Sequence, residues 1–261
     1  MKDFLRKRYP LTREPLARDV IATVSQYRHG ERLTWHQHQH GQLVVAVQGV
    51  VRVLTPTRTW TLPQSRAVWL PSDIDHELHA VGDLHLCNVY IEPHAFPWSW
   101  REPSVIHASP IVRELAQMLG EEGPGYAPGS RAGLCAPLLL KVLSDTPALP
   151  ESGVPLPGDA RLLAICEHMM NDPACDHTLD LWGDQLGASG RTLARRFKAE
   201  TGLTFNVWRQ QMRVSEAITR LALGQSVARI AKEFGYSSAS AFITMFKQVT
   251  GAAPQRYLAS D

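Results

Sequence analysis

Three closely spaced histidines lie in the segment WHQHQHGQ, residues 35–42, and their side chains could bind a metal ion or a polar ligand. If the segment is a β-strand, His36, His38 and His40 all point to one face, because side chains alternate between the two faces. Imidazoles that converge in this way bind divalent metal ions. The same cluster could instead face a metal-free ligand pocket or have only a structural role. All three interpretations stay open at this stage.

The same segment resembles the first motif of the cupin family, in which His-x-His is followed by a Glu and later by a Gly. Gln42 stands at the position of that Glu, with six residues between it and Gly49. Residues 71–76, PSDIDH, resemble the second cupin motif, with Asp73 where a Gly is usual. A neutral Gln weakens a metal site and argues against cupin-type dioxygenase or isomerase chemistry. The resemblance implies an effector site, or a divalent-metal site, formed by His36, His38, Gln42 and His76.

A second chemically distinctive group lies between Ser189 and Arg213 and could bind nucleic acid. This segment holds six basic residues and one acidic residue, a net charge of +5, whereas the whole chain carries only +2. In a helix, Arg191, Arg195 and Lys198 fall at positions i, i+4 and i+7 and form one stripe. Arg makes paired hydrogen bonds to guanine in the major groove, and neighbouring cations bind phosphates. The alternative is a solvated face of a helical bundle that meets no DNA.

The elements that position this stripe occur twice. The strings FKAETG (197–202) and FKQVTG (246–251) share four of six letters, and an apolar pattern of helical spacing precedes each, at residues 179–186 and 227–234. Each copy predicts a helix-turn-helix unit, with one more residue in the second turn. Residues 204–224 contain no Pro and predict a connecting helix of roughly 28 Å. Such a helix could hold two recognition helices about one DNA turn, roughly 34 Å, apart.

Capping residues and inward-facing residues refine this prediction. Thr178, Ser189 and Ser226 are candidate N-caps, because their side chains can accept a hydrogen bond from the first helical turn. Phe197 and Phe246 are expected to face inward in the two copies, each followed by a Lys and a helix-ending Gly.

Residues 188–257 resemble the DNA-binding domain of the AraC/XylS family of transcription regulators. That domain has two helix-turn-helix units joined by a long helix and ends in a Gly-x-x-Pro-x-x-Tyr signature, here Gly251, Pro254 and Tyr257. The resemblance implies base-facing positions at Arg191, Ala194 and Arg195 in the first unit and at Ala239, Ser240 and Thr244 in the second. The two alanines offer only apolar contact, and the second unit is expected to read DNA more weakly. The full predicted DNA-binding set is Arg191, Thr192, Ala194, Arg195, Lys198, Ser238, Ala239, Ser240, Thr244 and Lys247.

The remaining segments define the predicted domains. Residues 20–92 contain short runs rich in Val and Thr between turn residues, which is typical of an all-β sandwich or barrel. Residues 109–145 predict two helices, with Pro137 in the first turn of the second helix or at a kink. The Pro-rich residues 146–159 predict a linker. We expect an α+β two-domain fold with an N-terminal cupin-like β-barrel and helical pair (1–150) and a C-terminal all-α double helix-turn-helix domain (151–261).

Composition fits a soluble, cytoplasmic protein. Of the 261 residues 44% are hydrophobic, and no apolar run reaches the roughly 18–20 residues of a membrane helix. The start of the chain lacks the apolar region of a signal peptide. The four cysteines show no metal-binding spacing, so we expect free, reduced thiols.

These features together predict a sequence-specific DNA-binding transcription regulator, an activator or a repressor, controlled by a small-molecule or metal effector in the cupin-like domain. The expected partners are double-stranded DNA, the effector, a second copy of the chain held through residues 109–145, and RNA polymerase. No membrane partner and no catalytic residue is predicted. One rival is a cupin metalloenzyme with a helical interaction module, against which Gln42 argues. The other is a helical interaction module without DNA, against which the Arg stripe argues.

Overall fold

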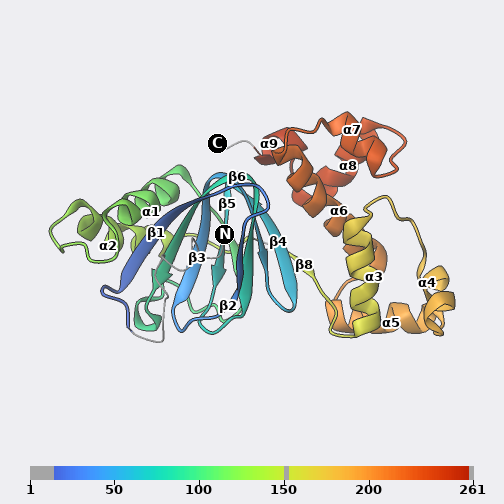
Figure 1. The fold of residues 1–261 in the computed structure, drawn as a ribbon, viewed down its shortest axis with the longest axis horizontal. Coiled ribbons are helices and arrows are strands. Elements are labelled where there is room, and N and C mark those ends of the chain that lie inside the picture. Colours follow the sequence, from blue (N-terminus) through green and yellow to red (C-terminus); the bar gives the residue numbers. More distant parts are fainter. Residues whose placement is uncertain (1–14, 150–152, 259–261) are drawn as a thin grey trace. The chain divides into compact units, whose positions relative to one another are not determined.

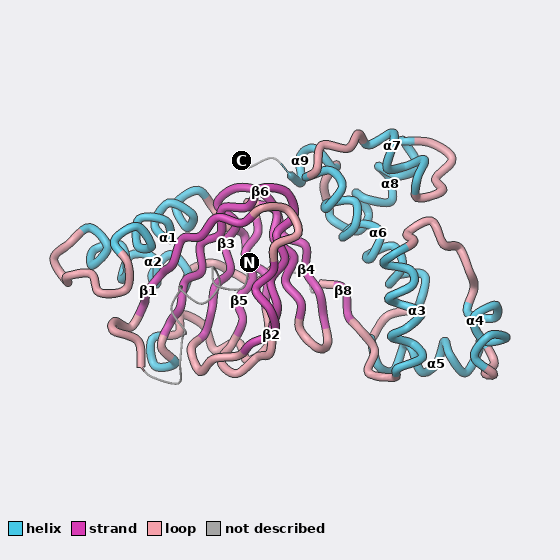
Figure 2. The backbone as a smooth tube through the Cα atoms, viewed as in Figure 1, coloured by secondary structure: helices cyan, strands magenta, loops and turns pink. Residues whose placement is uncertain are grey.

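The computed structural model describes residues 15–149 and 153–258, which separate into two units (Figure 1). Among these residues the N-terminal unit comprises 15–55 and 62–149, and the C-terminal unit comprises 56–61 and 153–258. Strands dominate the first unit and helices the second (Figure 2). None of the helices in the described residues is long and apolar enough to cross a membrane.

Two long antiparallel strands, β3 and β6, organise the sheet of the N-terminal unit. Each has different partners along its length: β1 pairs with the second half of β6 and β2 with its start, while β5 pairs with the start of β3 and β7 pairs with β5. The strands are β1 (Val20–Tyr27), β2 (Arg32–His36), β3 (Gly41–Leu54), β5 (Arg66–Leu70), β6 (His76–Ile91) and β7 (Ser104–His107). The strands predicted within residues 20–92 are thus confirmed.

The pairing of β3 with β6 is irregular around Gly49. The register between β3 and β6 shifts between Ala46 and Val50, which marks irregular pairing, and Gly49 has a φ of 84° there. A Cβ atom at this position would lie 2.3 Å from the carbonyl oxygen of Asp83 on β6. Only glycine fits both the left-handed backbone and this close approach. The Gly of the cupin-like motif therefore has a structural reason in this chain.

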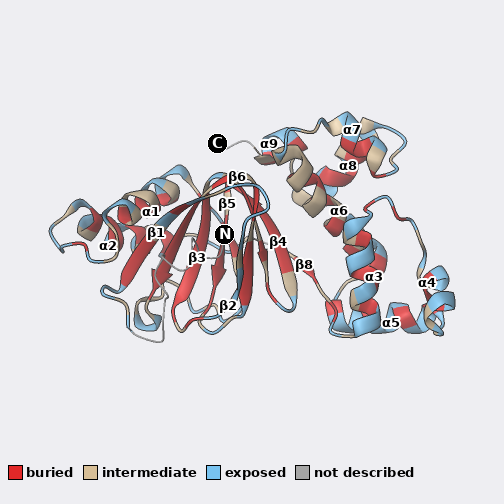
Figure 3. Ribbon diagram, viewed as in Figure 1, coloured by how far each residue is buried: buried red, intermediate tan, exposed pale blue. Residues whose placement is uncertain are grey.

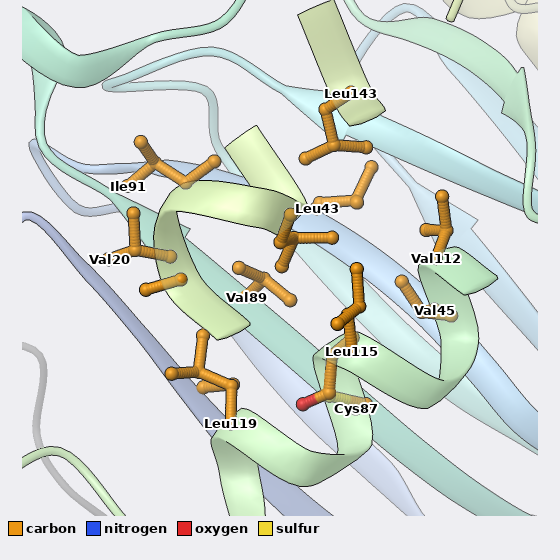
Figure 4. Close-up of a cluster of buried hydrophobic side chains, with 14 of the residues drawn as sticks. Val20, Leu43, Val45, Cys87, Val89, Ile91, Val112, Leu115, Leu119 and Leu143 are labelled. Atoms are coloured by element: carbon orange, nitrogen blue, oxygen red, sulfur yellow. The ribbon is translucent and has the colours of Figure 1, made fainter. Parts of the chain in front are cut away.

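The helical pair α1 (Pro110–Glu122) and α2 (Arg131–Ser144) packs on one face of the sheet. Leu43 and Val45 of β3 and Cys87 and Val89 of β6 meet the buried residues of α1, as Figure 4 shows. Since side chains alternate along a strand, the even-numbered residues of this part of β3 and β6 point to the opposite face of the sheet. That opposite face carries the polar residues of the candidate site.

Both predicted helices of this pair are confirmed, but Pro137 does not lie in the first turn of its helix. The helix begins at Arg131, with Ser130 as its N-cap, so Pro137 lies in the interior. Ser130 accepts a hydrogen bond from the N–H of Gly133. This cap starts the helix earlier than the proline alone suggested. Pro137 removes one helical N–H donor at a point where the helix continues to Ser144.

Helices α3 to α9 make up most of the C-terminal unit. They are α3 (Ala160–Asn171), α4 (Leu179–Leu186), α5 (Gly190–Thr201), α6 (Phe205–Ala222), α7 (Val227–Glu233), α8 (Ala239–Thr250) and α9 (Pro254–Leu258). A short ladder between β4 (Arg58–Pro63) and β8 (Val154–Pro155) adds to this unit. Part of the predicted linker is thus folded, since the carbonyl of Pro155 accepts a hydrogen bond from the Trp208 indole. Residues 150–152 of that linker lie outside the described residues.

Local signals account for the two helix-turn-helix units. Thr178, Ser189 and Ser226 each cap a helix by accepting a backbone N–H bond, as predicted. The pairs α4–α5 and α7–α8 are the two copies, and α6, 18 residues long, joins them. Phe197 and Phe246 are fully buried. The repeat in the sequence is therefore a repeat of the fold.

Candidate effector site and DNA-binding surface

The histidine cluster lies where β2 ends and β6 begins. His36, the last residue of β2, pairs across the sheet with His76, the first residue of β6, and their ring centroids are 4.2 Å apart. His38 lies two residues after the end of β2, with its ring 5.3 Å from that of His76. One ring nitrogen of each lies within 4.8 Å of the others. His38 and His76 are buried and His36 is half-buried.

His40 does not join this cluster, which corrects the expectation that three alternate histidines on one strand share a face. The strand ends at His36, so the alternation does not extend to His38 and His40. The His40 imidazole is fully buried, and its Nδ1 lies 3.6 Å from a carboxylate oxygen of Glu92. His38 instead meets His76, which comes from a distant part of the sequence.

Backbone carbonyls fix the orientation of the three clustered rings. Nδ1 of His36 lies 2.7 Å from the carbonyl oxygen of Thr34, and Nδ1 of His76 lies 2.7 Å from that of Ile74. Nδ1 of His38 lies 2.8 Å from the carbonyl oxygen of residue 40. A carbonyl oxygen only accepts, so each Nδ1 carries the proton that it donates. In the neutral forms of His36 and His76, Nε2 then keeps the lone pair, whereas Nε2 of His38 faces the side-chain oxygen of Gln42, which only accepts a hydrogen bond.

Gln42 lies beside the cluster, as its place in the cupin-like motif implied. Its Oε1 is 2.9 Å from Nε2 of His38, and its Nε2 donates to Oδ1 of Asn88 over 2.9 Å. Both amide side chains are buried. Asn88 was not among the predicted site residues, although an Asn within the apolar strand LHLCNVYI was a usable signal. Asn88 holds the Gln42 amide in place against His38.

Burial makes these histidines reluctant to ionise. Desolvation lowers the pKa of His38, and it lowers the pKa of His76 to about 3. The positive charge of a protonated His36 would lower the pKa of His76 further. Nε2 of His76 has no hydrogen-bond partner within the described part of the chain. The site therefore offers a buried His76 imidazole that is neutral near pH 7 and whose Nε2 has no partner among the described residues.

The predicted recognition surface of the first unit is the exposed face of α5. Leu193 and Phe197 are buried, while Arg191, Arg195 and Lys198 are exposed. Figure 3 shows that α5 carries both buried and exposed residues. These three cations form no ion pair with any residue that the structure describes. Their charge is thus available to an external anion.

Ala194 and Thr192, two further predicted residues of α5, differ in whether their side chains form hydrogen bonds within the helix. Ala194 is exposed and apolar, as the sequence states. Thr192 is also exposed, but its Oγ1 lies 2.9 Å from Oγ of the N-cap Ser189. Its backbone N–H donates to that same Oγ. The Thr192 hydroxyl therefore helps to cap α5.

Arg196 differs from its exposed neighbours, because it binds within the unit. Its Nε donates to Glu200 over 2.9 Å, and a terminal nitrogen lies 2.9 Å from Asp159. Arg213 likewise donates to the carbonyl of Pro173. Part of the +5 charge of this segment is therefore held within the unit, while Arg191, Arg195 and Lys198 of α5 have no ion pair among the described residues.

The second unit presents a nearly neutral face. Ser240, Thr244 and Lys247 are exposed on α8, and Ala239 is half-buried. Ser238 caps the helix by accepting from the N–H of Ala241. The Thr244 hydroxyl donates to the carbonyl of Ser240. Lys247 supplies the cationic group among these five predicted residues.

Comparisons with known proteins match both units. A model of the AraC-like ligand binding domain matches residues 20–131, and a model of the helix-turn-helix domain matches residues 182–260. The HTH-type transcriptional regulator NimR of Escherichia coli (strain K12) is 34% identical over 227 residues, which cover 86% of this chain and 81% of that protein. The chain belongs to the AraC family of transcriptional regulators.

More distant members of the AraC family align over a similar length. The HTH-type transcriptional activator RhaR of Escherichia coli (strain UTI89 / UPEC) is 23% identical over 243 residues, covering 85% of this chain and 86% of RhaR. Among solved structures, fatty acid-bound ToxT from Vibrio cholerae strain SCE256 is 13% identical, with a TM-score of 0.39, and the match covers 95% of this chain and 97% of ToxT.

The family assignment confirms the predicted fold class and the predicted general function. The N-terminal unit is an AraC-like, cupin-like ligand-binding domain, and the C-terminal unit contains an AraC-type helix-turn-helix domain. This AraC-family protein is a DNA-binding transcription regulator. The relatives are regulators rather than enzymes.

Proposed function

We propose that this AraC-family regulator binds double-stranded DNA through α5 and α8, and that an effector bound at the histidine cluster controls that binding. Residues 1–150 carry effector binding and dimerisation, and residues 151–261 carry DNA binding. The protein acts in the cytoplasm and has no catalytic role.

The observation that carries the DNA-binding proposal is the contrast between the two faces of α5. Its inner face is fixed by Leu193 and Phe197, while Arg191, Arg195 and Lys198 are exposed and have no partner within the part of the chain that the structure describes. An unpaired cationic face on a recognition helix suits guanine edges and phosphates in a major groove. The exposed α8 face offers hydroxyls and one lysine, which suit contacts with phosphates and recognition of DNA shape.

The proposed effector site rests on the buried polar cluster on the inner face of the sheet. His38, Gln42, His76 and Asn88 are buried polar residues, and one of their nitrogens, Nε2 of His76, lacks a partner among the described residues. An unsatisfied buried polar group costs about 1–3 kcal/mol. A bound effector that satisfies it would stabilise the N-terminal unit.

The helical pair supports a homodimer. Leu134 and Leu138 lie one turn apart on α2 and are 68% and 48% exposed, and Ile111 on α1 is 48% exposed. Contact with a second copy of the chain would remove these side chains from water, and the dimer would place two DNA-binding domains on one DNA. RNA polymerase stays a predicted partner, without a surface assigned to it.

Selection of bound sequences from random duplex DNA by the full-length protein tests the proposed function. Wild type should enrich one sequence, and Arg195→Ala should enrich a version with at least one base position relaxed. Recovery of unselected sequence by the folded wild-type protein would contradict specific DNA binding.

A further inference from the structure

We propose that Arg213 of α6 is a positioning residue that sets the rotation of the two helix-turn-helix units relative to each other. Its guanidinium group contacts the segment that leads into the first of these units and the turn of the second. These contacts, with Pro173, Cys175 and Tyr236, form the Arg213 clamp. The clamp rests only on contacts within the C-terminal unit, whereas its consequence for DNA recognition rests on the proposed function above.

Hydrogen bonds of Arg213 hold the segment between α3 and α4. Its Nε donates to the carbonyl oxygen of Pro173 over 2.8 Å, and a terminal nitrogen donates to that of Cys175 over 3.3 Å. This segment ends at Thr178, the N-cap of α4. The Cys175 side chain is buried in the same apolar cluster as Phe197 of α5. Arg213 therefore ties the start of the first helix-turn-helix unit to α6.

The ring of Tyr236 provides the contact with the second helix-turn-helix unit. The central carbon of the Arg213 guanidinium lies 5.6 Å from the centre of this ring, which is within the range of a cation–π interaction. Tyr236 lies between α7 and α8. Its N–H donates to the carbonyl of Ala231 on α7, and its ring lies 5.5 Å from that of Phe242 on α8. Through Tyr236, Arg213 is connected to both helices of the second unit.

Helix α6 alone fixes only part of the arrangement of the two units. Its length sets their separation along the helix axis, but their rotation about that axis depends on side-chain contacts. Near the start of α6, Phe205 packs against Phe197 of the first unit, with ring centroids 5.4 Å apart. Near its end, Arg220 bonds to Glu233 of the second unit. Arg213 lies between these contacts and connects to both sides, so it ties the two rotations together.

Rotation matters because two recognition helices in successive major grooves must match the helical phase of the duplex. One extra base pair between two blocks moves the second block by about 3.4 Å and turns it by about 35°. A fixed rotation therefore favours one spacing. When the rotation is free, only a fraction of the molecules has both helices correctly placed, and the apparent Kd rises in inverse proportion to that fraction.

Spin-label distances in the DNA-free, full-length protein test the clamp itself. Labels at Gln185→Cys on α4 and Gln248→Cys on α8 occupy exposed positions, and the four native cysteines are buried. We expect a narrow distance distribution in the otherwise wild-type protein and a broader one in Arg213→Ala. Arg209→Ala is the matched control and should stay narrow, because Arg209 lies one turn earlier on α6 and bonds to Asn206 of the same helix. An equally narrow distribution in a folded Arg213→Ala protein would overturn the clamp.

Variants of Tyr236 keep this test decisive if Arg213→Ala does not fold. Tyr236→Leu removes the aromatic ring and leaves the two hydrogen bonds of Arg213 to backbone carbonyls in place. It should broaden the distribution. Tyr236→Phe keeps the ring, so it should behave as wild type. No broadening in Tyr236→Leu would contradict the contact with the second unit.

DNA binding by the unlabelled proteins tests the consequence of the clamp. Wild type should prefer the selected operator to a version with one base pair inserted between the two blocks. Arg213→Ala should bind the selected operator about tenfold more weakly, the value for a competent fraction of about one tenth. It should bind a duplex with the first block alone as wild type does, and it should lose most of the preference between the two spacings. A variant that is merely destabilised would lose affinity for the single block and keep that preference.

The two measurements separate this inference from the proposed function. A broadened distribution with an unchanged spacing preference would contradict the role of the clamp in DNA recognition. A folded wild type that selects no sequence would contradict the proposed function, and the distance distributions would still decide whether the clamp exists. A narrow distribution and wild-type spacing preference in Arg213→Ala would refute the clamp and leave DNA binding intact.

Discussion

Two adjacent arginines on α5 are expected to have opposite roles, and replacing each by alanine separates them. Arg195 is exposed and has no internal partner among the described residues, whereas Arg196 bonds to Glu200 and pairs with Asp159. Arg195→Ala should therefore weaken DNA binding and leave stability unchanged. Arg196→Ala should lower the folding stability and leave DNA affinity nearly unchanged. The two changes remove the same side chain from neighbouring positions, so each controls for the other.

The magnitudes follow from these contacts. Loss of a paired contact to a base costs about 1–3 kcal/mol, or roughly 5- to 150-fold in Kd, and relaxes one base position. An exposed residue without partners changes folding stability by less than about 0.5 kcal/mol. For Arg196, which is about half exposed, each ion pair contributes about 0.2–1 kcal/mol after solvent screening. Its charge is already balanced within the unit, so its removal should change DNA affinity little.

Fluorescence anisotropy with the selected duplex and a scrambled duplex, over a range of salt concentrations, measures both effects, and urea unfolding measures stability. Lys198→Ala is a third arm. It should weaken binding to both duplexes and lower the slope of log K against log salt by about 0.9, the value for one phosphate contact. Wild-type affinity and selectivity in a folded Arg195→Ala protein, together with lost affinity in Arg196→Ala, would refute this assignment.

Three more predictions concern the dimer, the start of α3 and the first turn. Leu134→Glu with Leu138→Glu should convert a dimer to a monomer in sedimentation without lowering the melting temperature of the monomer, since both side chains are exposed; an unchanged dimer would rule out this face. Asp159, whose pKa is lowered to about 2, first by the Arg161 hydrogen bond, also caps α3, so Asp159→Ala should cost about 1 kcal/mol. Because the pKa of Asp159 is lower in the folded state than in the unfolded state, the wild type should lose this stability as the pH falls from about 4 through 2. Urea unfolding at pH 2–5 measures this loss, and the Asp159→Ala variant should not show it. Gly183→Val should abolish specific DNA binding, because a Cβ there lies 2.2 Å from the carbonyl of Ala188; normal binding by that variant would show that the first turn can relax.

The helical half of the fold could be predicted because its signals are local. Ser189 and Ser226 cap helices within three residues of their own positions, and the apolar spacing around Phe197 and Phe246 repeats along one chain segment. Such signals need no knowledge of distant contacts. The structural role of Arg196 was harder to predict, because its partner Asp159 caps the start of another helix, 37 positions earlier in the chain.

The candidate effector site was predicted only in part, because its geometry depends on where a strand ends. His36, His38 and His76 do come together, but through strand pairing of β2 with β6 and the segment after β2 rather than by alternation along one strand. The end of β2 removed His40 from the cluster. Asn88 was missed because its contact with Gln42 joins two strands whose register the sequence alone does not give.

The spacing of the two recognition helices gives the most direct test of the DNA-binding account. Helix α6 has 18 residues, about 27 Å, between the two helix-turn-helix units. We expect a selected operator with two conserved blocks about one helical turn, roughly 10 base pairs, apart. Insertion of five base pairs between the blocks turns the second block to the opposite side of the duplex. The affinity of the wild type should then fall to that for the first block alone. An insertion of ten base pairs should also remove the contacts with the second block, although that block then stays on the original side of the duplex. Equal affinity for the original and the five-base-pair operator would contradict the claim that α5 and α8 of one chain read successive major grooves.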